Sequence, residues 1–219
     1  MDDRRTFQVC SAILLVVMAL LAVSPVERGT WLMENAVVAV TLVALWAGRR
    51  WFRFSATGYG LITLFLVLHE IGAHYTYSKV PYDAWAQWAF GFSPDRLMGW
   101  QRNQYDRLLH GLYGLLLVLP LRELCRDGIG IRPGWAGFFA FSLILASSLI
   151  YELIEWSAAV LFGDGSAAFL GTQGDPWDAQ KDMALAMVGA LLMLSLAALA
   201  AGRRRPAAPA PDATGKEWS

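Results

Sequence analysis

Long apolar runs separated by short polar connections dominate the 219-residue chain. A helix needs about 20 largely apolar residues to cross the hydrocarbon core of a bilayer. Six runs meet or approach this length, and they predict membrane-spanning helices at Phe7–Val23, Leu32–Ala47, Tyr59–Tyr75, Leu108–Leu124, Trp135–Phe162 and Met183–Ala201. We therefore expect an all-α, polytopic transmembrane bundle of about six spans, with residues 1–205 forming a single domain.

Composition supports a lipid environment. The chain is 56% hydrophobic and 16% charged, whereas soluble domains average about 45–50% and about 25%. The formal net charge is zero, so electrostatics gives no argument for a nucleic-acid partner. Membrane lipid is the expected partner. The first apolar run follows Arg4 and Arg5 as in a signal peptide, but its length and the lack of a small-x-small cleavage site favour a retained helix.

Arginines cluster beside alternate ends of the predicted helices. The clusters are Arg4 with Arg5, Arg49 with Arg50 and Arg53, Arg122 with Arg126 and Arg132, and Arg203 with Arg204 and Arg205. Six spans place all of them on one side of the membrane, and the opposite side has only scattered cations. The excess of Lys and Arg in cytoplasmic loops therefore predicts that both termini are cytoplasmic. The Pro- and Ala-rich residues 206–219 predict a disordered cytoplasmic tail.

The longest connection, Thr76–Gln104, is predicted to lie on the outer side. It holds five large aromatic residues, namely Trp85, Trp88, Phe90, Phe92 and Trp100. A segment this aromatic is typical of the membrane surface. We expect a short interfacial helix near Tyr82–Phe90.

Ionisable side chains gather at the outer ends of the last four predicted spans. Given the alternating direction of the helices, one outer layer contains His69, Glu70, His74, Asp106, His110, Glu152, Glu155, Asp175, Asp178 and Asp182. Glu152 and Glu155 lie well inside the fifth span, where an ionised side chain costs about 2.5–3.5 kcal/mol or more. Such residues face the interior of a bundle and have a partner there.

Helical spacing places these residues in pairs on common faces. The pairs separated by four residues are Glu70 with His74, Asp106 with His110 and Asp178 with Asp182, and Glu152 and Glu155 are separated by three. Imidazole and carboxylate groups are ligands for Zn or Mn, and carboxylates also suit Mg. The pattern indicates a divalent-metal site that faces the periplasm.

Other roles for these residues stay open at this point. His69 and His74 are five apart, about 140° around a helix, so they do not bind one metal as in an HExxH motif. Asp178 suits the N-terminus of the sixth helix as well as it suits a metal. Glu152 and Glu155 have Arg107 or Lys181 as alternative partners in buried ion pairs.

Four motifs in a fixed order carry a resemblance to a known family. They are HEIGAHYTYSKVPYDAW, RNQYDRLLHGLYG, YELIEW and GTQGDPWDAQKDM. In these motifs the chain resembles the YjdF-like bacterial inner-membrane proteins, from the first predicted helix to the sixth. The resemblance implies a multi-pass protein of the bacterial inner membrane. It implies no catalytic activity and no ligand assignment.

These observations lead to one main functional hypothesis and two alternatives. The main hypothesis is a membrane-embedded, metal-dependent hydrolase that acts on a lipid or envelope substrate. Its expected ligands are Glu70, His74, Asp106 and His110, with His69, Asp178 and Asp182 as further candidates, and Glu152 or Glu155 is the expected general base. The alternatives are a proton-coupled transporter and a non-catalytic accessory protein in which the polar cluster is structural.

Overall fold

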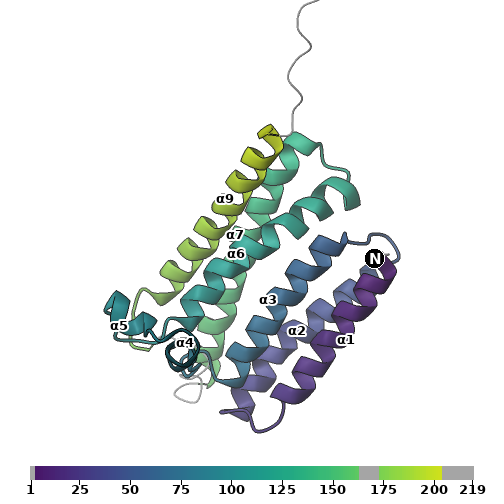
Figure 1. Cartoon of the computed structure of the whole chain (residues 1–219). Coiled ribbons are helices and arrows are strands. Elements are labelled where there is room, and N and C mark those ends of the chain that lie inside the picture. The colour runs from purple at the N-terminus through teal and green to yellow at the C-terminus, as the bar shows by residue number, and fades with distance from the viewer. Residues whose placement is uncertain (1–2, 163–172, 204–219) are drawn as a thin grey trace, which may run out of the picture.

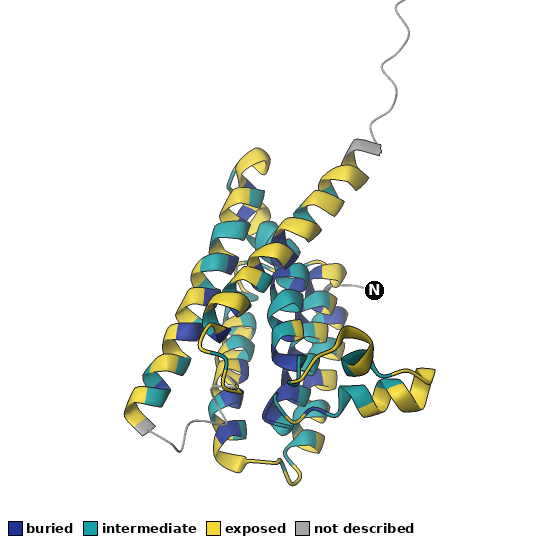
Figure 2. Cartoon of the chain, turned by 90° about the vertical axis from the view of Figure 1, so that its left-hand side faces the viewer, coloured by how far each residue is buried: buried dark blue, intermediate teal, exposed yellow. Residues whose placement is uncertain are grey.

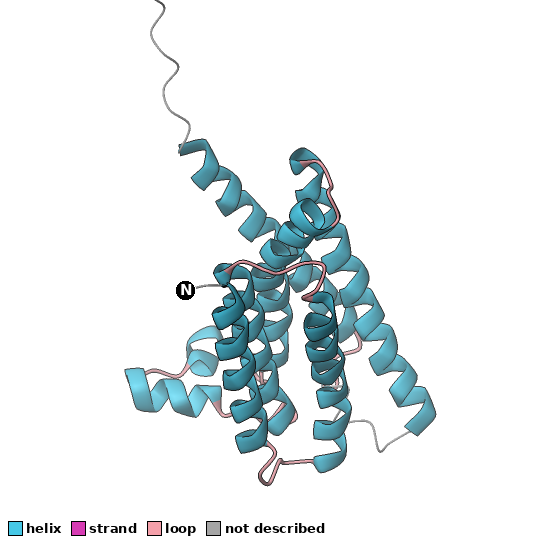
Figure 3. Cartoon of the chain, turned by 90° about the vertical axis from the view of Figure 1, so that its right-hand side faces the viewer, coloured by secondary structure: helices cyan, strands magenta, loops and turns pink. Residues whose placement is uncertain are grey.

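The computed structural model describes residues 3–162 and 173–203. Within these ranges the chain forms helices and connecting loops without strands (Figure 3). The elements are α1 (Asp3–Leu21), α2 (Arg28–Gly48), α3 (Ala56–His74), α4 (Tyr82–Phe90), α5 (Pro94–Met98), α6 (Tyr105–Glu123), the π-helical segment η1 (Leu124–Gly128), α7 (Pro133–Phe162) and α9 (Asp178–Arg203). The predicted tail at 206–219 lies outside the described residues.

Six of the described helices are long and apolar enough to cross a membrane, which confirms the predicted polytopic bundle. The predicted boundaries are furthest off at three N-termini. Helices α1 and α2 begin at Asp3 and Arg28, each four residues before the predicted start, and α9 begins at Asp178, five residues before it. Hydropathy alone excluded these polar residues. In α9, Asp178 is nonetheless favourable in the first turn, where the helix dipole is positive.

The two ends of the bundle differ (Figure 1). The N-terminus lies at the same end as the C-terminal part of α9, and the short helices α4 and α5 lie at the opposite end, here called the α4 end. The chain therefore crosses the bundle six times, and the ends of the helices that carry His, Glu and Asp gather at the α4 end. That this end faces the periplasm stays a prediction from the arginine pattern.

Two three-helix units form the bundle. Helix α3 contacts α1 and α2 in the first unit, whereas α6, α7 and α9 contact one another in the second. The core of the first unit contains Leu14, Val38, Ile62 and Leu66, and that of the second contains Val118, Ala140, Ile144, Ala186 and Ala190. The units meet where α3 packs on α6 (Figure 1). The cavity described below lies at this boundary, and the candidate metal group lies beside it in the second unit.

The outward faces of the long helices are apolar and exposed (Figure 2). Val40, Leu20 and Leu161, for example, are 70%, 66% and 76% exposed. In water such continuous apolar surface is unfavourable, but in a bilayer it contacts lipid chains at no cost. The low internal burial of the helices is therefore consistent with a small bundle that is surrounded by lipid.

Helix α4 has the bounds that the sequence predicted. Gly91 ends it with a positive φ of 76°, a conformation that glycine adopts without steric cost. Asp83 accepts a hydrogen bond from the Ser93 hydroxyl at 2.8 Å, and Tyr82 bonds Asp95, so α4 and α5 are tied together. Trp88, 89% exposed, projects from this pair. The location of α4 at a membrane surface remains a prediction.

Candidate metal centre and the adjoining cavity

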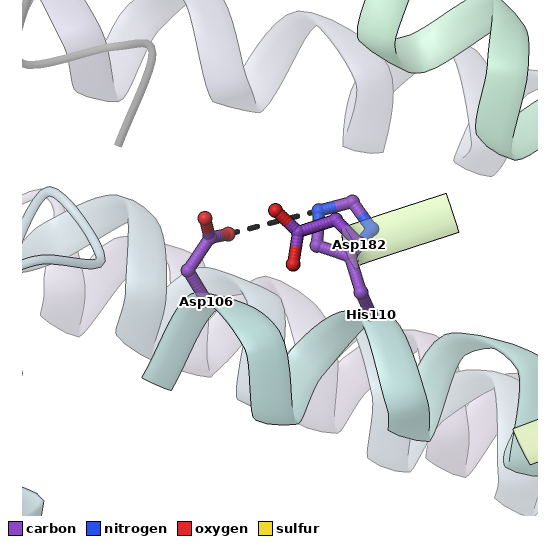
Figure 4. A group of neighbouring side chains, drawn as sticks. All are labelled: Asp106, His110 and Asp182. Carbon is purple, nitrogen blue, oxygen red and sulfur yellow. Dashed lines mark ion pairs between the residues drawn. The ribbon is translucent and has the colours of Figure 1, made fainter. Parts of the chain in front are cut away.

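Three of the predicted ligands lie together at the α4 end. Asp106 and His110 are one turn apart on α6, and Asp182 points towards them from α9 (Figure 4). One ligand atom from each lies within 4.8 Å of the other two, and among the described residues this is the one such group of three. Ligands about 2.0–2.2 Å from a zinc ion lie roughly 3.4 Å apart. Small side-chain movements would therefore close the group around an ion.

Close packing of α6 on α9 determines where Asp182 lies. A Cβ atom on Gly114 would be 1.9 Å from the carbonyl oxygen of Ala186, and one on Gly189 would be 2.1 Å from that of Gly111. The two backbones thus touch directly, as small residues permit between membrane helices. Asp182 is one turn before Ala186 on α9. The contact consequently holds its carboxylate beside His110.

Glu152 extends this group from α7. Its Oε1 lies 3.7 Å from Nε2 of His110, too far for a hydrogen bond. The side chain is buried, and neither this oxygen nor Oδ1 of Asp182 accepts a hydrogen bond. Buried oxygens without a hydrogen-bond partner are costly. We therefore expect these two oxygens to bind a ligand or to carry a proton. Glu155 lies one turn further along α7, within electrostatic range of Glu152 and Asp106.

The cations that the sequence offered as alternative partners of Glu152 and Glu155 lie elsewhere. Arg107 pairs with both Asp175 and Asp178, and Lys181 Nζ lies 2.5 Å from Asp175. Arg102 Nη1 also bonds Asp178 at 2.7 Å. Asp178, a predicted ligand, is therefore part of this ion-pair network. The Lys181 ammonium, followed by the Trp177 backbone N–H, holds the pKa of Asp175 well below its usual value.

A second polar network at the α4 end is centred on Glu34. This carboxylate is 1% exposed, and its Oε2 accepts a hydrogen bond from the Tyr151 hydroxyl at 2.9 Å, while the Tyr77 hydroxyl oxygen lies 3.4 Å away. The bond from Tyr151 joins α2 to α7 and thus links the two units. Glu34 was not predicted as a site residue, although a carboxylate two turns inside an apolar span is a functional signal. Nothing in the sequence indicated its tyrosine partners.

His69 belongs to this second network. Its Nδ1 lies 2.7 Å from the Tyr77 hydroxyl, and its Nε2 lies 3.4 Å from the Glu34 carbonyl oxygen. Burial, followed by the charge of Glu34, raises the pKa of Tyr77 well above its usual value, so this hydroxyl is a donor. His69 Nδ1 therefore accepts, and Nε2 carries the proton that faces the carbonyl.

A tight turn after α3 places Tyr77. Thr76 and Tyr77 both have positive φ values, 53° and 50°, which are uncommon for residues with a side chain. The turn folds the Tyr77 ring over Gly72, where an added Cβ would lie 2.5 Å from the ring. Gly72 is therefore needed for the ring to reach His69.

The remaining two predicted ligands, Glu70 and His74, lie apart from the three-residue group. His74 Nδ1 bonds the carbonyl oxygen of Leu21 at 2.7 Å and so ties the end of α3 to the end of α1. The Glu70 carboxylate is fully buried and faces Asn35, but neither oxygen forms a hydrogen bond of regular geometry. The predicted Glu70–His74 pair thus does not join Asp106 and His110.

An internal cavity of about 340 Å³ connects the two polar groups. Its polar lining includes His69, Tyr77, Asp106, His110 and Tyr151. The rest of the wall comes from α2, α3, α6 and α7. It contains the hydroxyl residues Thr41, Tyr113, Ser147 and Ser148 and the apolar residues Val37, Ile62, Phe65, Leu66, Leu109, Leu117, Ile150 and Ile154. Its volume lies in the range of about 300–1,000 Å³ that is typical of small-molecule sites. The cavity therefore has its carboxylate and imidazole groups towards the α4 end, and a body of apolar side chains with a few hydroxyls.

Fold and site together define a polytopic α-helical membrane protein with a polar site at one end of its bundle. Residues 6–203 match the family described as predicted membrane protein (DUF2238). The chain is also 39% identical over 170 residues to inner membrane protein YjdF of Escherichia coli (strain K12), which covers 77% of this chain and 78% of that protein. The chain belongs to this family. The predicted family and inner-membrane location are thereby confirmed, and no solved structure matches the chain.

Proposed function

We propose that Asp106, His110 and Asp182 bind a divalent metal ion. The observation that carries this proposal is the convergence of one imidazole and two carboxylates within 4.8 Å inside a membrane-spanning bundle. Carboxylates in such a position are stable when they are paired or coordinate a metal. The ammonium and guanidinium groups nearby pair with Asp175 and Asp178 instead. A bound Zn, Mn or Mg ion would supply the missing positive charge.

The proposed ligand set is narrower than the one predicted from sequence. His74 bonds the Leu21 carbonyl, and Asp178 pairs with Arg102 and Arg107. We assign these two residues to structure. His69 and Glu70, in or beside the Glu34 network, are assigned to the support of the neighbouring helices, because they lie outside the three-residue group.

The reaction that best fits this site is hydrolysis of an ester or phosphoester of a lipid or envelope component. A bound divalent ion lowers the pKa of a coordinated water. Glu152, whose Oε1 is free of hydrogen bonds and 3.7 Å from His110, is placed to accept the proton of that water. With an ion held by Asp106, His110 and Asp182, Glu152 would take the proton of the attacking water and return it to the leaving oxygen as the ester C–O or P–O bond breaks. Glu155, one turn away, is the second candidate for this role.

Metal binding is the first step to test. Purified protein in detergent would be titrated with Zn, Mn and Mg by calorimetry, and its metal content measured by mass spectrometry. We expect one ion per chain in the wild type and a loss of affinity of about 10–100-fold or more in Asp182→Asn and His110→Gln, since supporting residues alone contribute that much. Asp127→Asn, at the opposite end of the bundle, is the control and should bind as the wild type does.

A structural role for the cluster is the competing interpretation. It is favoured by the position of His110 Nε2, which lies 3.7 Å from a carboxylate oxygen of both Asp106 and Glu152 and so brings the three side chains together without an ion. In that case the folded wild type would bind no stoichiometric metal. His110→Gln would then lower thermal stability while metal has no effect on either protein. This result would refute the metal site and the hydrolase with it.

A further inference from the structure

The cavity beside the candidate metal centre opens towards the bilayer. Val37 on α2 and Ile150 and Ile154 on α7 line it and are also 39%, 56% and 49% exposed on the surface of the bundle. All three belong to membrane-spanning segments. Residues that line a cavity and are also exposed on the outer surface of the bundle lie at the opening of that cavity, here called the mouth. The mouth therefore lies between α2 and α7, at a depth where the surroundings are hydrocarbon chains.

The Glu34–Tyr151 hydrogen bond bridges α2 and α7 next to this mouth. On α2, Val37 and Thr41 lie one and two turns beyond Glu34, in the direction away from the α4 end. The wall of the cavity on that side of the bridge is mainly apolar. Its polar end, formed by Asp106 and His110 among others, belongs to the candidate metal group. A molecule that fills the cavity from the mouth would meet mainly apolar groups along its body, and the Asp106 carboxylate and the imidazoles at one end.

We propose that this cavity binds one hydrocarbon chain of a membrane lipid, which enters sideways between α2 and α7. A lipid chain is the molecule already present at the mouth, so it reaches the cavity without leaving the bilayer. The polar end then receives the part of the lipid next to the headgroup. That the bound lipid is the substrate rests on the proposed hydrolase, whereas chain binding itself does not depend on metal.

The lining and volume of the cavity favour a lipid hydrocarbon chain over a water-soluble solute. Its carboxylate and imidazole side chains lie near the α4 end. Deeper in the wall, the hydroxyls of Thr41, Tyr113 and Ser147 already form hydrogen bonds within the protein, so they offer little to a sugar or peptide. Burial of polar groups without partners is costly. Apolar cavity walls take up apolar ligands, as an engineered cavity of about 150 Å³ does with benzene. The volume of about 340 Å³ is larger and suits part of an extended chain.

The test uses a photoreactive lipid and a blocked mouth. Full-length protein is reconstituted in vesicles that contain phosphatidylglycerol with a diazirine on one palmitoyl chain, irradiated, and digested for mass spectrometry. Labels are expected on the inner wall, at Phe65, Leu109 or Ser147, in addition to the outer surface. Val37→Trp places an indole in the mouth and should lower inner-wall labelling about tenfold, which corresponds to ~1.4 kcal/mol of binding free energy.

The chain offers matched controls for this experiment. Val40→Trp makes the same change on α2 at a residue that is 70% exposed and does not line the cavity, so its inner-wall labelling should equal that of the wild type. If Val37→Trp does not fold, Ile150→Trp replaces it, with Leu149→Trp on the same helix as its control. Labels confined to outward residues, or equal inner-wall labelling in the mouth variant and its control, would overturn the proposal.

One further variant separates this proposal from the proposed function. Asp182→Asn removes a proposed metal ligand and leaves the apolar wall intact, so inner-wall labelling should persist while metal binding is lost. Inner-wall labelling in a protein that binds no metal would support a lipid-chain site without hydrolysis. Metal binding without inner-wall labelling would refute the chain site and leave the metal centre in place.

Discussion

Substitution of Gly114 tests the contact that positions the candidate site. In Gly114→Ala the new Cβ would lie 1.9 Å from the Ala186 carbonyl oxygen, whereas ordinary carbon–oxygen contacts are about 3.3–3.6 Å. Helices α6 and α9 must therefore separate by roughly 1.4 Å or more. Overpacking of this kind costs about 1–3 kcal/mol. Intrinsic helix propensity alone would give the opposite sign, since alanine is better than glycine in a helix by up to ~1 kcal/mol.

Gly111→Ala is the matched control on the same helix. An added Cβ at Gly111 meets nothing within 4 Å, so this variant should be as stable as the wild type or more so. Thermal unfolding of the protein in detergent, followed by tryptophan fluorescence, compares the two. Because Asp182 is one turn from Ala186, Gly114→Ala should also weaken metal binding in calorimetry, and Gly111→Ala should not. Equal stability and equal metal affinity of both variants would refute the close-contact argument.

Three further predictions concern the surroundings of the site. Tyr151→Phe removes the 2.9 Å hydrogen bond to buried Glu34 and should destabilise the protein by about 1–3 kcal/mol in chemical unfolding; an unchanged unfolding midpoint would exclude this bond as a link between the units. The pKa of Asp175 is lowered in the folded protein, so its stabilisation is present above about pH 4 and is lost as the pH falls further. The melting temperatures of wild type and Asp175→Asn should therefore converge below pH 4, and a difference that does not depend on pH would contradict this. Finally, Ser93→Cys should react with a membrane-impermeant thiol reagent in intact cells and Trp51→Cys should not; the reverse pattern would invert the predicted orientation.

The ion-pair network at Asp175 and Asp178 shows why spacing alone did not identify the ligands. Asp178 and Asp182 are four residues apart on one helix, and the sequence offered both to a metal. In the folded chain Arg102 and Arg107 reach Asp178 from the loop before α6 and from α6 itself, while Asp182 faces His110. Spacing shows which residues share a helix face. It does not show which neighbouring helix that face meets.

Hydropathy and charge in the sequence determined the class of protein, the number of spans and the end at which the ionisable groups gather. These features follow from local rules, because each apolar run of sufficient length crosses the bilayer independently and adjacent spans alternate in direction. The sequence also predicted α4 at its observed bounds. The YjdF-like motifs were sufficient to indicate the family, because they are long and occur in a fixed order along the chain.

Tertiary structure alone decided which of the predicted residues meet. The approach of α6 to α9 at Gly114 and Gly189 brings Asp182 to Asp106 and His110, and it arises from two segments about 75 residues apart in the chain. The same holds for the Glu34–Tyr151 bond, which joins residues separated by 117 positions. Such contacts depend on how small and large side chains fit between helices, and this fit has no periodic signal in the sequence. The outer polar layer was therefore predictable as a layer, whereas its division into a metal group, an ion-pair network and a buried glutamate network required the fold.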